Sequence, residues 1–186
     1  MNYKEHLQGL VLQNEANGWL DSIDSYSNHR PMLMLALSLT KGRVIEMGSG
    51  FGSTPYLTSY CYATSREFLS FDYNMEWANK TGSAWVQDWD KDLRWQKPCG
   101  LLFVDHSPGE HRHVAIKMMM DKADVICVHD SEIGGAGDYK LEKVRPLFKY
   151  ELGFNIHQGG AGCTLLSNKV DVSKFKGLTY CNKILD

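Results

Sequence analysis

The sequence has few cysteines, and it shows neither a disulfide framework nor a zinc-binding motif. The number is odd, the spacing is wide and no CxxC pair occurs, so a structural zinc site and a secreted, disulfide-stapled fold are both disfavoured. The first ten residues, MNYKEHLQGL, lack the basic-then-apolar pattern of a signal peptide. We therefore expect a cytoplasmic protein with reduced cysteines. The cysteines are Cys61, Cys99, Cys127, Cys163 and Cys181.

Long apolar runs and an excess of one charge are also missing. The longest apolar segment, PMLMLALSL, is much shorter than the roughly 20 residues that cross a bilayer, so no membrane partner is expected. The formal net charge is −2 and no basic run is interleaved with aromatic residues, so no nucleic-acid partner is expected. The 186 residues, 43% of them hydrophobic, are enough for one domain with a full core.

Apolar strands alternate with helical segments along the chain. Strands are expected at residues 43–47, 67–72, 84–89, 100–106 and 124–130. Helical periodicity appears at residues 3–20, 25–40, 53–64, 75–82 and 111–123. This order indicates βαβ units and a parallel sheet. Near the C-terminus, residues 139–152 are mixed, with a helix that Pro146 breaks or kinks, and residues 153–158 and 162–168 are predicted to pair as a hairpin.

Polar residues gather where the predicted strands end. In an open α/β sheet, ligands bind outside the carboxyl ends of the strands, so these residues indicate a site assembled from several strands. They are Glu46, Asp72, Asp105 with His106, and His129 with Asp130.

A glycine-rich loop follows the first of these strands, in the segment GRVIEMGSGFGSTPYL. Gly48, Gly50 and Gly52 alternate directly after Glu46. Glycine lets the backbone lie against a ligand, and the loop presents free N–H groups; a structural turn is the less favoured alternative. Glu46 can bind an ammonium group, which a pyrophosphate ligand lacks. Asp72 stands at the next strand end, where an acid can accept ribose hydroxyls.

This set of motifs resembles the class I S-adenosylmethionine (SAM)-dependent methyltransferases. EMGSGFGS looks like their motif I and LSFDYN like their second motif, and VQDW looks like the loop after the third strand. LLFVDHSPGEHR and VICVHDSE resemble the fourth- and fifth-strand motifs of a bacterial subgroup of small-molecule O-methyltransferase-like enzymes. The resemblance covers roughly residues 40–168.

The resemblance implies an α/β fold: a Rossmann-like, seven-stranded, mostly parallel sheet with helices on both faces and an antiparallel terminal hairpin. Residues 1–40 would form an N-terminal helical cap within the same domain, 41–170 the SAM-binding methyltransferase domain and 171–186 a C-terminal tail.

The resemblance also implies which residues bind SAM. The loop glycines would line its methionine part, Glu46 its amino group, Asp72 its ribose and Asp88 its adenine, although Asp90 or a plain solvated loop acid is an alternative to Asp88. The full set is Glu46, Gly48, Ser49, Gly50, Gly52, Ser53, Asp72 and Asp88.

Catalysis is expected from Asp105, His106, His129 and Asp130. A hydroxyl acceptor must lose its proton to a base or near a metal ion, and both routes stay open. By resemblance, Asp105 and Asp130 match carboxylates that hold Mg²⁺ or another divalent ion, but Ser131 and Glu132 stand where the third ligand is usually an amide or acid. Without a metal, His106 or His129 would be the base.

The leading prediction is a SAM-dependent methyltransferase that methylates oxygen on a small-molecule acceptor, with a homodimer as one way to complete the acceptor pocket. One alternative is a protein that binds SAM without transferring its methyl group, or that cleaves SAM. Another is an NAD-type oxidoreductase, against which Glu46 and the missing Tyr-x-x-x-Lys unit argue.

Overall fold

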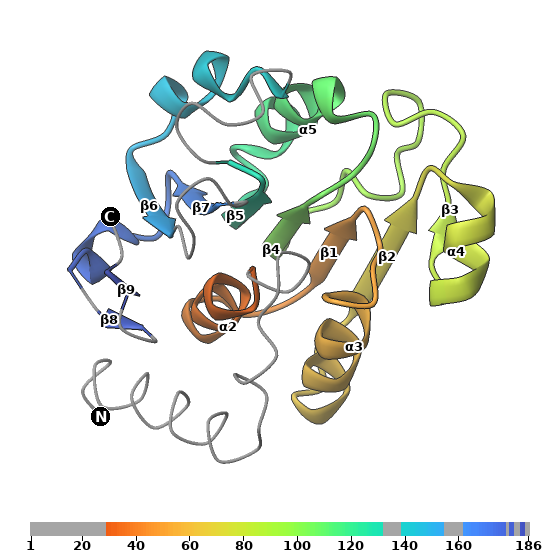
Figure 1. Cartoon of the computed structure of the whole chain (residues 1–186), viewed down its shortest axis with the longest axis horizontal. Helices are drawn as coiled ribbons and strands as arrows, with labels where there is room; N and C mark the ends of the chain where they lie inside the picture. Colours follow the sequence, from red (N-terminus) through yellow and green to blue (C-terminus); the bar gives the residue numbers. More distant parts are fainter. Residues whose placement is uncertain (1–28, 132–138, 155–161, 178, 181–182, 185–186) are drawn as a thin grey trace.

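A seven-stranded sheet forms the centre of the molecule (Figure 1). The computed structural model describes residues 29–131, 139–154, 162–177, 179–180 and 183–184. The strand order is β3-β2-β1-β4-β5-β7-β6, with all neighbours parallel except β7, which is antiparallel to both β5 and β6. The strands are β1 (Val44–Met47), β2 (Phe68–Asp72), β3 (Ala84–Trp85), β4 (Cys99–Val104), β5 (Ala123–His129), β6 (Tyr150–Phe154) and β7 (Cys163–Ser167).

Within the described residues, the α-helices that accompany the sheet are α2 (Arg30–Leu39), α3 (Thr54–Ala63), α4 (Met75–Thr81) and α5 (Arg112–Met119). Pro31 and Pro55 stand in the first turns of α2 and α3. Backbone N–H groups in a first turn have no partner within the helix, so proline, which lacks this group, is tolerated there. Asn74 caps α4 by accepting a bond from the Trp77 N–H at 3.0 Å, and Gly82 ends this helix with φ +74°. A separate pair, β8 (Thr179–Tyr180) and β9 (Lys183–Ile184), follows the sheet.

Each face of the sheet has its own apolar core. Alternate strand residues point to opposite sides, so Val44 and Phe103 pack with α2 and α3, while Ile45 and Leu102 pack with α5. Figure 1 shows α2 and α3 together on one side of the sheet. Helices therefore cover both faces, and the predicted Rossmann-like architecture with an antiparallel β6–β7 hairpin is confirmed.

The strand order reverses between β1 and β4. From β1 the chain runs outward through β2 to β3, and it then crosses back to β4 and β5 on the other side. The crevice at such a switch point, beyond the carboxyl ends of the strands, is where open α/β sheets bind ligands.

Three predicted elements differ from the structure. The strand expected at 84–89 stops at Trp85, because the chain turns where Asp88 accepts a bond from the Asp90 N–H at 3.0 Å. The segment at 139–152 contains two short 3₁₀ turns, Leu141–Lys143 and Arg145–Leu147, and strand β6 in place of a kinked helix. The first hairpin strand begins at Tyr150, before the predicted 153.

Several other predictions fall outside the described residues, namely the helix at 3–20, most of the proposed cap and Glu132. Within the described part of the chain, no helix has the length and apolar character needed to cross a membrane.

Candidate functional site

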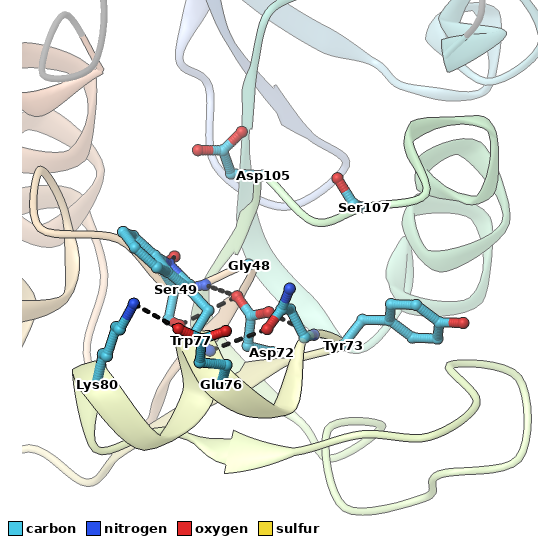
Figure 2. A pocket seen from close by; sticks show the side chains of 10 residues that line it. Gly48, Ser49, Asp72, Tyr73, Glu76, Trp77, Lys80, Asp105 and Ser107 are labelled. Carbon is cyan, nitrogen blue, oxygen red and sulfur yellow. Dashed lines mark hydrogen bonds and ion pairs between the residues drawn. The ribbon is translucent and has the colours of Figure 1, made fainter.

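A cavity of about 410 Å³ opens at the carboxyl ends of β1, β2 and β4 (Figure 2). It brings together Gly48 after β1, Asp72 at the end of β2 and Asp105 after β4, which the sequence predicts for one site. Its volume lies in the range of small-molecule sites. The lining residues are Gly48, Ser49, Asp72, Tyr73, Asn74, Glu76, Trp77, Lys80, Asp105 and Ser107.

Gly48 is required by the protein's own backbone. Its φ is +92°, and a Cβ added there would lie 2.5 Å from the carbonyl carbon and oxygen of Asp105. The sequence suggests that a ligand approaches the loop closely, but at Gly48 the approaching group is the chain leaving β4. At Gly50 a Cβ would meet nothing closer than 3.9 Å, so this part of the loop is open.

Asp72 ties the glycine loop to the end of β2. Its Oδ2 accepts bonds from the Ser49 N–H at 2.8 Å and the Ser49 hydroxyl at 3.1 Å, and its Oδ1 accepts the Asn74 N–H at 2.8 Å. A carboxylate oxygen has two lone pairs, so Oδ1 can accept a further hydroxyl from the cavity. Asp72 therefore shapes the loop and also offers a binding oxygen.

Trp77 forms one wall of the cavity. Its indole Nε1 donates to the Ser49 carbonyl at 2.5 Å, and its ring meets Phe51 edge-on with centroids 5.0 Å apart. The sequence alone leaves two roles open for the tryptophans: packing in the core, or stacking on the adenine of a cofactor. Trp89 and Trp95 are buried in the core, whereas Trp77 lines the cavity.

Glu46 lies beneath the loop and does not line the cavity. It is fully buried, and its Oε2 accepts bonds from the Thr54 hydroxyl at 2.8 Å and the Ser70 hydroxyl at 2.5 Å. Thr54 in turn accepts the Gly50 N–H at 2.9 Å, so Glu46 supports the loop from below. Burial raises the pKa of Glu46 to about 7.

Asp88 and the end of the loop also lie away from the cavity. Asp88 forms an exposed ion pair with Lys91 at 2.8 Å, and the hydrogen bond from Lys91 lowers the pKa of this carboxyl. Ser53 is the buried N-cap residue of α3, and the Gly52 carbonyl accepts a bond from Arg30 Nε at 2.9 Å. Of the predicted cofactor residues, Gly48, Ser49 and Asp72 are the ones that line this cavity.

The predicted catalytic residues cluster beside the cavity, where Arg112 holds them together. Arg112 from α5 is buried, and its Nη2 lies 3.0 Å from Asp105 Oδ1 while its Nη1 lies 3.5 Å from Asp130 Oδ2. It also donates to the carbonyls of His106 and His129, at 3.0 and 2.9 Å. The ends of β4 and β5 are thus joined by one guanidinium.

His129 is paired with Asp105. Its Nδ1 lies 3.1 Å from Asp105 Oδ1 and 3.6 Å from Asp130 Oδ1. Burial works to lower the pKa of His129, but the hydrogen bond and charge of Asp105 outweigh it and raise this pKa to about 9. Burial likewise works to raise the pKa of Asp105, but His129 and Arg112 keep it below its ordinary value.

His106 is placed differently from His129. It is fully buried, its ring packs edge-on against Trp89 at 4.6 Å, and neither ring nitrogen has a hydrogen-bond partner among the described residues. Burial and the charge of Arg112 lower its pKa to about 3. Of the two histidines considered as bases, His129 is the one that meets an acid.

The Asp105–Asp130 pair does not fit a Mg²⁺ site of the kind that the resemblance implies. The Arg112 guanidinium already bridges both carboxylates, and His129 Nδ1 lies within 3.6 Å of each. Ser131, which follows Asp130, donates its hydroxyl to Thr164 at 2.7 Å and to the Val128 carbonyl at 3.0 Å. Among the described residues, the pair therefore lacks the further oxygen ligands that a hard ion such as Mg²⁺ needs.

His29 joins this cluster from the start of α2, although nothing in the sequence marks it. Its ring meets His129 edge-on at 4.9 Å and Phe103 at 4.9 Å. Burial, and then the neighbouring His129, lower the pKa of His29 to about 3, so it is a neutral imidazole.

Comparison with known proteins identifies the fold. No family model matches the sequence, and no curated protein matches it. Among solved structures, cofactor-bound Rv0187 from MTB aligns with a TM-score of 0.54 at 14% identity, over 88% of this chain and 90% of that one.

Two further solved structures are methyltransferases by name. The O-methyltransferase TomG from Streptomyces achromogenes, in complex with SAM, aligns with a TM-score of 0.50 at 13% identity, over 87% of this chain and 89% of its own. A human methyltransferase 10 domain containing protein aligns with a TM-score of 0.52 at 12% identity, over 77% and 83%. The chain therefore has the Rossmann-like fold of the class I SAM-dependent methyltransferases.

Proposed function

We propose that this protein is a SAM-dependent methyltransferase that transfers a methyl group to oxygen on a small molecule. One observation carries the proposal: a single cavity at the switch point of a methyltransferase-type sheet joins Gly48, Asp72 and Asp105. The solved structures of the same fold include one with SAM bound.

We expect SAM to occupy the cavity in one orientation. The ribose hydroxyls would meet Asp72 Oδ1, which has a lone pair to spare. The adenine would lie against the partly buried ring of Trp77. The methionine end would then follow the loop from Gly48 towards Asp105.

The transfer step needs a proton acceptor near Asp105. The acceptor oxygen attacks the methyl carbon, the S–C bond breaks, S-adenosylhomocysteine leaves, and the hydroxyl proton must go to a nearby group. Asp105 is the predicted catalytic residue that lines the cavity, with a quarter of its side chain exposed. We assign proton acceptance to Asp105, and positioning roles to His129 and Asp130, which contact it directly or through Arg112.

Binding to SAM is tested by titration calorimetry with SAM, S-adenosylhomocysteine and NAD. Asp72→Asn should weaken SAM binding by roughly 10- to 100-fold, because it removes hydrogen bonds made by a charged acceptor. Asp88→Asn is the matched control, and its SAM affinity should be unchanged, because Asp88 lies outside the cavity. NAD binding without SAM binding, or equal effects of the two variants, would contradict the proposal.

Transfer is tested separately from binding. Methyl-labelled SAM is incubated with a panel of small hydroxyl compounds, and labelled acceptor is the expected product. Label released without an acceptor would favour SAM cleavage, and bound but unchanged SAM would favour a binding protein.

The setting and assembly of the enzyme remain part of the proposal. Free thiols at Cys61, Cys99, Cys127 and Cys163 support a reducing, cytoplasmic location. A net charge of −2 supports a small-molecule acceptor over nucleic acid. A homodimer that completes the acceptor pocket is a prediction for sedimentation analysis.

A further inference from the structure

Three side chains from distant parts of the chain converge beside the cofactor cavity. His29 comes from the start of α2, Asp105 from the end of β4 and His129 from the end of β5. One potential ligand atom from each lies within 4.8 Å of the other two. This arrangement differs from the Asp105–Asp130 pair that the sequence suggests as a metal site.

His29 is the member whose chemistry lacks an explanation. It is 1% exposed, and neither of its ring nitrogens makes a hydrogen bond of good geometry among the described residues, although, against the lowering effect of burial, the Gly52 backbone is near enough to raise its pKa slightly. Leaving a buried polar group unpaired costs about 1–3 kcal/mol, and a role in binding an ion is one recognised reason for such a group. The ring is aimed at the cluster, because it meets His129 edge-on at 4.9 Å.

The separation of Asp105 and His129 is compatible with short metal–ligand bonds, and the third ligand atom, on His29, lies within 4.8 Å of both. Asp105 Oδ1 and His129 Nδ1 are 3.1 Å apart, close to the edge of about 3.4 Å that bonds of 2.0–2.1 Å give in a tetrahedron. Two imidazoles and one carboxylate are a ligand set of zinc and non-haem iron sites, whereas Mg²⁺ prefers oxygen ligands only. The residues therefore favour a borderline transition-metal ion.

Charge and access are compatible with such an ion. The carboxylates of Asp105 and Asp130 outnumber the single guanidinium of Arg112 that contacts them, so the cluster becomes net negative once His129 gives up its proton to bind the ion. The two histidines are buried, while Asp105 lines the cavity. Asp105 would thus connect a bound ion to the cavity.

We propose that His29, Asp105 and His129 bind a divalent transition-metal ion of the zinc type at the acceptor side of the cofactor cavity. Its part in catalysis rests on the proposed methyl transfer, where such an ion would polarise the acceptor hydroxyl. The site itself is a separate claim, because it needs only the three ligands.

The test uses Co²⁺ as the probe, since its visible spectrum reports the geometry of its ligands. Metal-free wild-type protein should take up one equivalent of Co²⁺ with a tetrahedral-type spectrum, and Zn²⁺ should displace it. His29→Gln and Asp105→Asn should each weaken binding by roughly 100-fold or more, beyond the 10- to 100-fold loss typical of residues that only support a ligand. His29→Cys, which keeps a metal ligand, should retain binding and add a thiolate-to-cobalt band.

Two controls separate this site from its alternatives. Asp130→Asn should weaken Co²⁺ binding by no more than the roughly 10- to 100-fold typical of a residue that supports a ligand, because Asp130 only contacts His129 and Arg112, whereas the Asp105–Asp130 site would lose binding altogether. His111→Gln replaces a histidine whose side chain is 44% exposed, and its Co²⁺ affinity should match the wild type.

Three results would overturn the inference: no Co²⁺ or Zn²⁺ uptake by the wild type, unchanged uptake by His29→Gln, or loss of uptake in Asp130→Asn. Far-UV circular dichroism shows that each variant is folded, and calorimetry with SAM on the metal-free wild type distinguishes the two proposals. Protein that binds SAM but not Co²⁺ refutes this site alone, and protein that binds Co²⁺ but not SAM refutes the proposed function alone.

Discussion

At the scale of single residues, the alternating glycines of the first loop serve different purposes. Gly48 combines φ +92° with the close passage of the Asp105 backbone, whereas Gly50 has open space beside it. The neighbour of Gly48 is main chain and cannot rotate away as a side chain could. The same spacing thus contains one glycine that the fold requires and one that leaves room for a ligand.

Replacing each glycine by alanine should separate these purposes. Gly48→Ala should lower the free energy of unfolding by about 2–5 kcal/mol, because it adds both backbone strain and overpacking. Gly50→Ala should lower it by about 1 kcal/mol or less, because the new Cβ meets nothing within 3.9 Å. Urea denaturation followed by circular dichroism measures both, and equal losses of stability would contradict this distinction.

At the scale of elements, α5 is joined to two strand ends through one side chain. The sequence leaves Arg112 open as an exposed ion-pair partner or a group for a substrate carboxylate. In the structure it is 4% exposed and contacts Asp105 and Asp130 as well as two carbonyls. The guanidinium carbon of Arg112 also lies over the Tyr139 ring, 4.1 Å from its centre. Arg112 therefore fixes the positions of the proposed catalytic residues without lining the cavity.

Removing this guanidinium should destabilise the fold strongly. Arg112→Met should cost about 3–5 kcal/mol of unfolding free energy, because it leaves buried carboxylate and carbonyl groups without their partner. Lys169→Met is the control: its ion pair with Asp124 is exposed, so the expected loss is below about 1 kcal/mol. Urea midpoints of the two variants provide the comparison, and similar midpoints would show that Arg112 has no structural role.

At the scale of the whole molecule, the arrangement of strands was predictable but the direction of many side chains was not. The apolar runs at β4 and β5 mark strands buried on both faces, and their polar ends mark one edge of the sheet. Whether a given side chain faces the cavity depends on which face of its strand it occupies and on local bends of the chain, which the pattern of strands does not determine. Glu46 shares the α3-side face with Val44, and Asp88 is turned outward where the chain bends.

His29 illustrates what a linear sequence cannot reveal. It lies two residues before Pro31 at a predicted helix start, with no neighbour in the sequence that suggests a role. Only the packing of α2 on β4 and β5 brings its ring to His129, a hundred residues later in the chain. Sites assembled from one residue per element carry no spacing signal, whereas the glycine loop is continuous and was recognisable.

The stability of the whole molecule should depend on pH through Glu46. Its pKa is about 7 in the folded protein, against 4.5 for an ordinary glutamate, so the folded state binds a proton that the unfolded state has released. This contribution is fully present below pH 4.5 and is lost as the pH rises through 7. The shift corresponds to roughly 3 kcal/mol.

Glu46→Gln should remove this dependence, because glutamine stays neutral. Between pH 5 and pH 8 its unfolding free energy should rise relative to the wild type by roughly 2–3 kcal/mol, measured by urea denaturation at each pH. The raised pKa of His129 affects both proteins alike and cancels in the difference. Glu67→Gln, which alters an exposed ion pair with Arg43, should give a profile parallel to the wild type. If the Glu46→Gln profile is also parallel, the pKa of Glu46 is not raised by folding, and the hydrogen bonds from Thr54 and Ser70 offset its burial.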